Sequence, residues 1–228
     1  MKDEEDNVLD LIEELEPIMN DLQTPWELLC VDDGSTDATG IILKDLQKSK
    51  KYLRVIAFSN HFGQSSAFDA GFKAAKGDTI ITMDGDRQND PHDIPKLLEA
   101  MDDCDLVCGR RHQRQDSLLK KIISKVANKV RSRLCGDGMQ DTGCSLKAYR
   151  ASCLHQIKMY HGMHRFLPAL FTIEGFRTKQ IDVNHRQRLK GSTKYNLFNR
   201  SFNTVADLFA VVWMRKRRLN YTIHQEIP

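Results

Sequence analysis

The stretch ITMDGDRQNDP, residues 80–90, places oxygen-rich side chains where an apolar run ends. Asp84, Asp86 and Gln88 alternate there and offer only oxygen donors. Hard divalent cations such as Mg²⁺ and Mn²⁺ prefer these ligands, which water and substrate phosphates usually complete. The competing interpretation is that Asp90 caps the helix that follows while the other carboxylates are solvated. A short acidic motif alone favours that second interpretation, so the rest of the chain has to decide.

A second acidic block, Asp32 and Asp33, follows the apolar run WELLCV. Carboxylates do not bind phosphate, but they accept hydrogen bonds from base N–H groups or ribose hydroxyls, and Gly34 permits a tight turn. The alternative is an ordinary helix start capped by Ser35. Ligands of open α/β sheets gather beyond the carboxyl ends of the strands. Two acidic strand ends therefore predict a nucleotide site beside a metal-bound diphosphate.

Alternating strands and helices must position these two blocks. The strands are expected at 26–31, 53–59, 78–84 and 104–109. The intervening helices are expected at 5–22, 35–47, 63–77 and 90–101. This alternation predicts an α/β fold with a largely parallel sheet flanked by helices. The later elements are expected to be a basic helix at 117–135, a strand within 142–150, a helix around Pro168, a strand at 178–185 and a helix at 197–215.

The composition suits one sizeable core and an anionic partner. The 228 residues are 40% hydrophobic and 29% charged. The net charge is only +3, yet acids crowd the start of the chain and basic residues gather after Gly109. That asymmetry favours phosphates, nucleic acid or an acidic membrane surface as partner over solvated helix faces alone. No recognised nucleic-acid-binding motif accompanies the basic runs, so nucleic acid is not expected.

The cysteines and the apolar runs bear on the compartment. The six cysteines form no C-x-x-C pair and have no metal-type histidine spacing, which is typical of reduced thiols in a cytoplasmic protein. The sequence has no signal peptide, and no apolar run reaches the roughly 20 residues needed to cross a bilayer. We therefore expect a cytoplasmic protein.

Several sequence blocks together resemble a known family. They are VDDGSTD, NHFGQSSAFDAGFKAAKGD, TMDGDRQNDP, CGRR, QDTGCSLKAYR and HRQRLKGSTKYN. Their order is similar to that in family 2 glycosyltransferases of the GT-A fold, most of all the branch of polyprenyl-phosphate (dolichyl-phosphate) sugar synthases. The resemblance covers nearly the whole chain. It implies a metal-dependent, inverting transfer of a hexose from a UDP- or GDP-linked sugar to a lipid phosphate. The alternatives are a saccharide or cell-envelope glycan acceptor, or an impaired protein that only binds nucleotide-sugars.

The resemblance also implies roles for residues on the donor side. The nucleoside would contact Glu4, Val31, Asp32 and Asp33. Asp84 would lie near the nucleotide and the sugar, while Asp86 and Gln88 would ligate Mg²⁺ or Mn²⁺. The donor diphosphate would be neutralised by Arg188 and Lys194.

On the acceptor side, the resemblance implies that Arg110, with Lys120 or Lys121, binds the lipid phosphate. Asp141 of the DTGC block would lie near the catalytic centre, formed with Asp84, Asp86 and Arg110. A phosphomonoester has a second pKa of about 6, so it is already mostly an oxyanion at neutral pH and needs little help from a general base. Its difficulty is repulsion from the anionic donor, which cations relieve. A sugar hydroxyl would instead require a nearby base.

Both ends of the chain carry further expectations. The family usually opens with a central strand and a P-x-Y-N-E-E turn, whereas this chain begins inside that turn, at 1–5. We expect an upstream segment or another part of the chain to fill that strand's place. The branch commonly has an apolar residue where Arg87 stands. We expect a catalytic domain at 1–196 and a C-terminal amphipathic, basic appendage at 197–228.

The appendage combines an apolar helix face with a basic run. The apolar residues are Leu197, Phe198, Phe202, Val205, Leu208, Phe209, Val212 and Trp213. The basic run is 215–218. This pattern predicts a helix in the headgroup region on the cytoplasmic face of an anionic membrane. The competing interpretation is that the apolar face packs on the domain or, in a homo-oligomer, on a second subunit.

Overall fold

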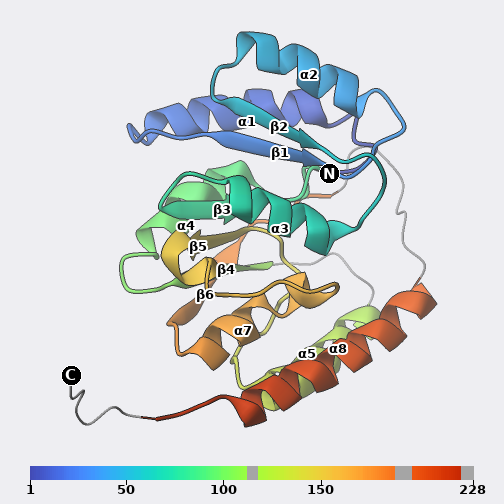
Figure 1. Cartoon of the computed structure of the whole chain (residues 1–228), viewed down its shortest axis with the longest axis vertical. Helices are drawn as coiled ribbons and strands as arrows, with labels where there is room; N and C mark the ends of the chain where they lie inside the picture. Colours follow the sequence, from blue (N-terminus) through green and yellow to red (C-terminus); the bar gives the residue numbers. More distant parts are fainter. Residues whose placement is uncertain (112–117, 188–196, 222–228) are drawn as a thin grey trace, which may run out of the picture.

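A computed structural model describes residues 1–111, 118–187 and 197–221, with side chains described in all of these except 118–126 and 197–203 (Figure 1). The strands are β1 (Leu28–Asp32), β2 (Leu53–Ala57), β3 (Thr79–Thr82), β4 (Leu106–Arg111), β5 (Lys147–Arg150) and β6 (Thr178–Val183). The helices are α1 (Val8–Asp21), α2 (Thr39–Ser49), α3 (Gln64–Ala74), η1 (Pro91–Asp93), α4 (Ile94–Glu99), α5 (Leu118–Cys135), α6 (Ala151–Leu154), η2 (Met163–Arg165), α7 (Leu167–Glu174) and α8 (Leu197–Arg217).

The strands form two sheets. β1 and β2 pair in parallel, and a four-stranded sheet has the order β3-β5-β4-β6. Within it β4 and β6 are parallel, but β5 runs antiparallel between β3 and β4. The predicted α/β fold is confirmed. The larger sheet is mixed and not largely parallel as expected, because the returning strand β5 pairs antiparallel with both of its neighbours. In Figure 1 the smaller sheet lies at one end with α1 and α2, and α5 and α8 lie at the other.

Each face of the larger sheet is covered by a cluster of buried apolar residues. Successive residues of a strand point to opposite faces. On β4, Leu106 and Cys108 accordingly pack with Phe72 of α3 and Phe171 of α7, whereas Val107 packs in the cluster that α1 and α4 share. The strand is therefore covered by helices on both sides, which holds its carboxyl end in a fixed place.

All six cysteines are buried and unpaired. Burial raises the pKa of the Cys30 and Cys108 thiols to about 12. These thiols therefore stay protonated at neutral pH.

Met1 pairs with the end of β1. Its ammonium donates to the Val31 carbonyl at 2.7 Å, and its own carbonyl accepts from the Asp33 N–H at 2.8 Å. In a parallel sheet a residue forms hydrogen bonds in this way to the two residues that flank its partner on the neighbouring strand, and here that partner is Asp32. A Cβ added to Gly85, just after β3, would lie 3.0 Å from the Met1 Cβ. Met1 thus lies between the carboxyl ends of β1 and β3.

The last helix, α8, contacts α5 and α7. Val211 is fully buried in an apolar cluster against which Leu208 and Met214 also pack. Val205, Phe209 and Trp213 remain 51%, 69% and 62% exposed. The apolar residues of α8 therefore divide into an inner and an outer face, because the helix packs on the domain and still leaves one stripe open. Nowhere in the described part of the chain is a helix long and apolar enough to cross a membrane. The expected boundary at residue 196 falls outside the described residues.

Candidate active site

The acidic turn after β3 is held from several sides. The Thr82 hydroxyl donates to the Ser145 carbonyl at 2.6 Å. Arg87 has a φ of +60°, a conformation that residues other than glycine rarely adopt, and its guanidinium pairs with Asp10 of α1. Asp86 is only 7% exposed and accepts from the Gln88 N–H at 3.1 Å. These contacts keep the turn in one conformation with Asp86 inside it.

Asp84 lies next to Asp86 at the start of this turn. Its Oδ1 accepts from the Gln64 Nε2 at 3.1 Å, and its N–H donates to the Asn89 Oδ1 at 3.2 Å. Burial, together with repulsion from Asp86, raises the pKa of the Asp84 carboxyl. A bound divalent cation would relieve both effects, and the donors Asp84, Asp86 and Gln88 supply only the hard oxygen ligands it prefers. The side chains therefore fit the expected ion.

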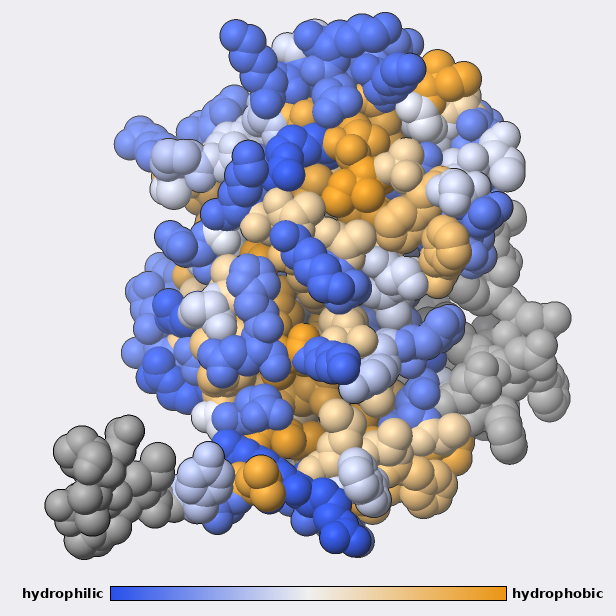
Figure 2. All heavy atoms as spheres, in the orientation of Figure 1, coloured by the Kyte–Doolittle hydropathy of each residue, from blue (hydrophilic) through white to orange (hydrophobic). Residues whose placement is uncertain are grey.

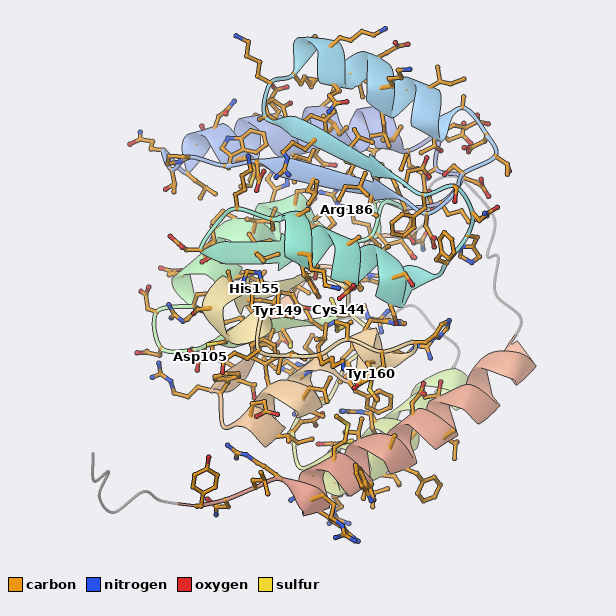
Figure 3. All side chains as sticks on the ribbon, viewed as in Figure 1. Asp105, Cys144, Tyr149, His155, Tyr160 and Arg186 are labelled. Atoms are coloured by element: carbon orange, nitrogen blue, oxygen red, sulfur yellow. The ribbon has the colours of Figure 1, made fainter. Side chains whose placement is uncertain are left out.

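A second carboxylate group lies nearby on α1 and η1. Ligand atoms of Glu14, Asp90 and His92 lie within 4.8 Å of one another. The Arg186 guanidinium already holds this group, with Nη1 at 2.7 Å from Glu14 Oε1 and Nη2 at 2.6 Å from Asp90 Oδ1. The backbone N–H of Arg186, a residue labelled in Figure 3, also donates to the Gln88 carbonyl at 2.8 Å. Arg186 therefore ties the segment after β6 to the acidic turn.

Asp90 also accepts from the His92 N–H at 3.1 Å and is the N-cap of η1. The proposed helix cap at this position is therefore present. It does not compete with a metal role for the turn, because Asp84 and Asp86 take no part in the cap.

Asp32 and Asp33 at the end of β1 are buried and bonded within the protein. Asp32 accepts from the N–H and hydroxyl of Ser35. Asp33 accepts from the Phe62 N–H at 2.7 Å and the Gly63 N–H at 2.9 Å. These contacts give both carboxylates a structural role in shaping the turns around them.

The turn of residues 61–64 connects the two acidic blocks. At its start, His61 Nδ1 lies 2.8 Å from Asp33 Oδ2. At its end, Gln64 reaches Asp84. The structure therefore brings Asp33 and Asp84 to the two ends of one short turn, at the carboxyl edge of the strands. The NHFGQ block supplies this turn, and its place between a strand and a helix is the signal that could have marked His61 and Gln64.

The remaining nucleoside candidates lie near β1. Val31 is within the strand and receives the hydrogen bond of the Met1 ammonium. The Glu4 carboxylate accepts from Asn7 Nδ2 at 2.7 Å, and its backbone carbonyl accepts from the Asn7 and Val8 N–H groups. Glu4 thus also stabilises the beginning of α1.

Arg110 and Arg111 diverge at the end of β4. Arg110 makes two contacts with Asp182, at 2.5 and 2.8 Å, on an exposed surface. Arg111 makes two contacts of 2.8 Å with Asp141, in a pair that is mostly buried. Burial opposes the charge of Arg111, but Asp141 and, more weakly, Asp84 raise the pKa of its guanidinium. Arg111, which sequence reasoning missed, therefore lies on the Asp84 side of the strand.

Four of the expected cations fall outside what the structure describes. Arg188 and Lys194 belong to 188–196, and the side chains of Lys120 and Lys121 belong to the part of α5 without described side chains. Their roles stay predictions.

Comparison with known proteins identifies the family. The chain matches glycosyl transferase family 2 over residues 1–158. It is 40% identical over 225 residues to dodecaprenyl-phosphate galacturonate synthase of Rhizobium johnstonii, which covers 93% of this chain and 64% of that protein. It is 37% identical over 207 residues to undecaprenyl-phosphate 4-deoxy-4-formamido-L-arabinose transferase of Pectobacterium carotovorum, covering 90% and 63%. The chain thus spans less than two thirds of the length of these relatives.

A solved structure agrees in fold. Glucosyl-3-phosphoglycerate synthase from Mycobacterium tuberculosis, crystallised with Mn²⁺, UDP-glucose and phosphoglyceric acid, superposes with a TM-score of 0.71 at 17% identity, over 93% of this chain and 77% of that one. At that identity the likeness concerns the fold. With its acidic turn, its α/β architecture and these relatives, the chain belongs to glycosyl transferase family 2 and has the GT-A fold.

Proposed function

We propose that this protein transfers a hexose, with inversion, from a nucleotide-sugar to a polyprenyl phosphate. The observation that carries the proposal is the turn containing Asp84 and Asp86, joined through residues 61–64 to Asp33. Two relatives support the acceptor, since their names describe dodecaprenyl- and undecaprenyl-phosphate as the substrates of sugar transfer.

The donor would lie along the carboxyl edge of β1 and β3. Asp86 and Gln88, with Asp84 beside them, would hold Mg²⁺ or Mn²⁺, which would neutralise charge on the departing diphosphate. A UDP-linked sugar is the donor we propose, since a structural neighbour was crystallised with UDP-glucose and Mn²⁺. The nucleoside would lie toward Glu4, Val31, Asp32 and Asp33, with Arg188 and Lys194 beside the diphosphate.

The acceptor side is rich in cations, as a phosphate nucleophile requires. Arg110 and Arg111 end β4, and Lys120 and Lys121 belong to α5, the next element of the chain. An oxyanion needs no proton removed before it attacks, so the task of these residues is to hold it against the repulsion of the donor diphosphate. Arg110 and Arg111 are both paired with aspartates, which orients their guanidinium groups.

We further propose that the protein works at the cytoplasmic face of a membrane, attached through α8. Figure 2 shows hydrophobic residues along the edge that α8 forms, interspersed with hydrophilic ones. The outer face, Val205, Phe209 and Trp213, is followed by Lys216 and Arg217, which are exposed. An apolar stripe next to cations suits a helix lying in the headgroup region. The buried, unpaired cysteines support a reducing compartment.

A thermal-shift panel of UDP- and GDP-sugars, with and without Mn²⁺, tests the donor. Binding to the folded state raises the melting temperature by mass action. We expect a metal-dependent rise with a UDP-sugar, followed by transfer to undecaprenyl phosphate in detergent. A panel in which no nucleotide-sugar raises the melting temperature, with or without Mn²⁺, would contradict the proposed function.

A further inference from the structure

A cavity of about 270 Å³ opens between the start of α3 and α8. One wall is the turn of residues 61–65, and another is the segment that follows Tyr160, labelled in Figure 3. That segment supplies His161, His164 and Arg165, and α8 supplies Asp207. The cavity therefore collects three histidines, counting His61, and an arginine in one place.

The contacts in the cavity wall hold these groups in position. Arg165 Nη1 donates to the Thr204 hydroxyl of α8 at 2.9 Å. The Ser65 hydroxyl lies 2.7 Å from His164 Nδ1 and accepts from the Gly162 N–H at 3.0 Å. The first turn of α3 has no side-chain cap and borders the same cavity, so its N–H groups add partial positive charge.

The cavity lies between Gln64, which contacts Asp84, and the inner side of α8. Gln64 lines it and also donates to Asp84, the carboxylate expected beside the sugar. On the other side, α8 presents Thr204 and Asp207 inward and its apolar stripe outward. The cavity therefore lies between the expected position of the donor and the helix that carries the apolar stripe.

The position of Asp207 shows that the basic groups of this cavity interact with a carboxylate. Its carboxylate packs so closely on Gly162 that a Cβ there would collide with it. Burial raises the pKa of this carboxyl, while Arg165 and His161 act in the opposite direction. The cavity thus already holds one oxyanion of the protein near Arg165, and the charge of that oxyanion must oppose the entry of a second.

We propose that this cavity receives the acceptor's phosphate, a monoester oxyanion, with Arg165 and His161 as its ligands. This rests on the proposed function, and it places Arg165 and His161 beside the phosphate in addition to the cations of β4 and α5 named above. From there a phosphate oxygen forms a bond to the anomeric carbon of the sugar. The bond from that carbon to the diphosphate oxygen breaks, and its electron pair leaves with the nucleoside diphosphate. No proton has to be transferred.

Calorimetry with a short prenyl monophosphate tests the assignment. Geranyl phosphate is titrated into the protein saturated with Mn²⁺ and UDP, with geraniol as the uncharged control. We expect Arg165→Gln to weaken geranyl phosphate binding at least tenfold and Arg165→Lys to retain most of it. Asp207→Asn should strengthen binding severalfold, because it removes the opposing charge. The matched control, Arg177→Gln, changes an exposed arginine paired with Asp105 outside the cavity and should have no effect.

The outcomes separate this proposal from the proposed function. Unchanged geranyl phosphate affinity in Arg165→Gln would overturn it, as would weaker binding in Asp207→Asn. A tenfold loss of Mn²⁺–UDP affinity in Arg165→Gln would assign the cavity to the nucleotide instead. A selective loss of UDP-glucuronate relative to UDP-glucose would place the oxyanion on the donor sugar and also overturn it. If the wild type binds no Mn²⁺–UDP, the proposed function fails. If it binds Mn²⁺–UDP but not geranyl phosphate, only the cavity assignment fails.

Discussion

Arg111 and Asp141 form a two-point ion pair, with both nitrogen–oxygen distances at 2.8 Å and side chains only 17% and 9% exposed. The adjacent residue, Arg110, forms a similar pair with Asp182 whose side chains are 39% and 45% exposed. Strand β4 thus ends in two arginines that are each paired with an aspartate but differ in their exposure to solvent. The environment, more than the number of contacts, should decide what each pair contributes to stability.

Arg111→Gln should lower the free energy of unfolding by about 3 kcal/mol, because it removes the Arg111 cation from the mostly buried pair with Asp141. Arg110→Gln should cost about 1 kcal/mol or less, because water screens the exposed pair. Urea unfolding followed by circular dichroism measures both. Equal losses in the two variants would contradict the argument from solvent access.

Asp84→Asn should stabilise the metal-free protein by about 0.5–2 kcal/mol, the range typical of a single stabilising substitution. The pKa of Asp84 is raised in the folded state, so its ionisation destabilises the fold. The sign follows: the wild type is relatively more stable at acid pH and loses that advantage as pH rises through the folded-state pKa. Asparagine keeps the acceptor for Gln64. Unfolding curves at pH 4 and 7.5 should converge for the two proteins at the lower pH, and a constant difference would refute the explanation.

Asp86→Asn should abolish the Mn²⁺-dependent part of UDP binding and weaken affinity in the presence of Mn²⁺ at least tenfold, about 1.4 kcal/mol. The reason is the loss of a charged oxygen ligand in the acidic turn. Titration calorimetry with UDP, with and without Mn²⁺, measures it. The control is Asp69→Asn, which changes a partly exposed carboxylate paired with Lys73 on α3. An unchanged dependence on Mn²⁺ in Asp86→Asn would show that the ion lies elsewhere.

Neutralising Lys216 and Arg217 should reduce binding to anionic vesicles by more than about tenfold, since each cation near such a surface contributes about 1 kcal/mol. These two are chosen because Arg215 and Arg218 also bond to the carbonyls of Leu134 and Glu174. Co-sedimentation with vesicles of anionic or neutral lipid measures the effect.

The control for this experiment is the double change of Lys44 and Lys48 to glutamine on α2, at the other end of the molecule in Figure 1. Phe209→Ser tests the apolar stripe separately. Equal pelleting with neutral vesicles at high salt, or no pelleting at all, would leave α8 as a contact for another protein surface.

Most of the fold and the acidic part of the site could be predicted from the sequence, because they depend on local order. The alternation of strands and helices places Asp33 and Asp84 at strand ends without knowledge of tertiary contacts. The direction of β5 could not be read in this way, because the chain returns to the sheet only after α5 and either direction keeps its apolar residues buried.

The hydrogen-bond and ion-pair partners of these residues could not be predicted from the sequence either. Asp33 accepts a hydrogen bond from the N–H group of Phe62, which is 29 residues away along the chain. Which of Arg110 and Arg111 lies near the acidic turn depends on which face of β4 that turn approaches. Likewise, the apolar residues of α8 do not reveal which of them the domain covers. Each of these follows from packing between distant segments, for which composition and spacing carry no signal.

The contact between Met1 and Gly85 has a consequence for the distance between the two acidic strand ends. The nitrogen and carbonyl of Met1 are both hydrogen-bonded to the end of β1, and its side chain lies against Gly85 in the turn that carries the acidic site. A side chain at position 85 would meet Met1 at about van der Waals distance or closer, so the absence of a side chain at Gly85 lets the ends of β1 and β3 approach each other this closely.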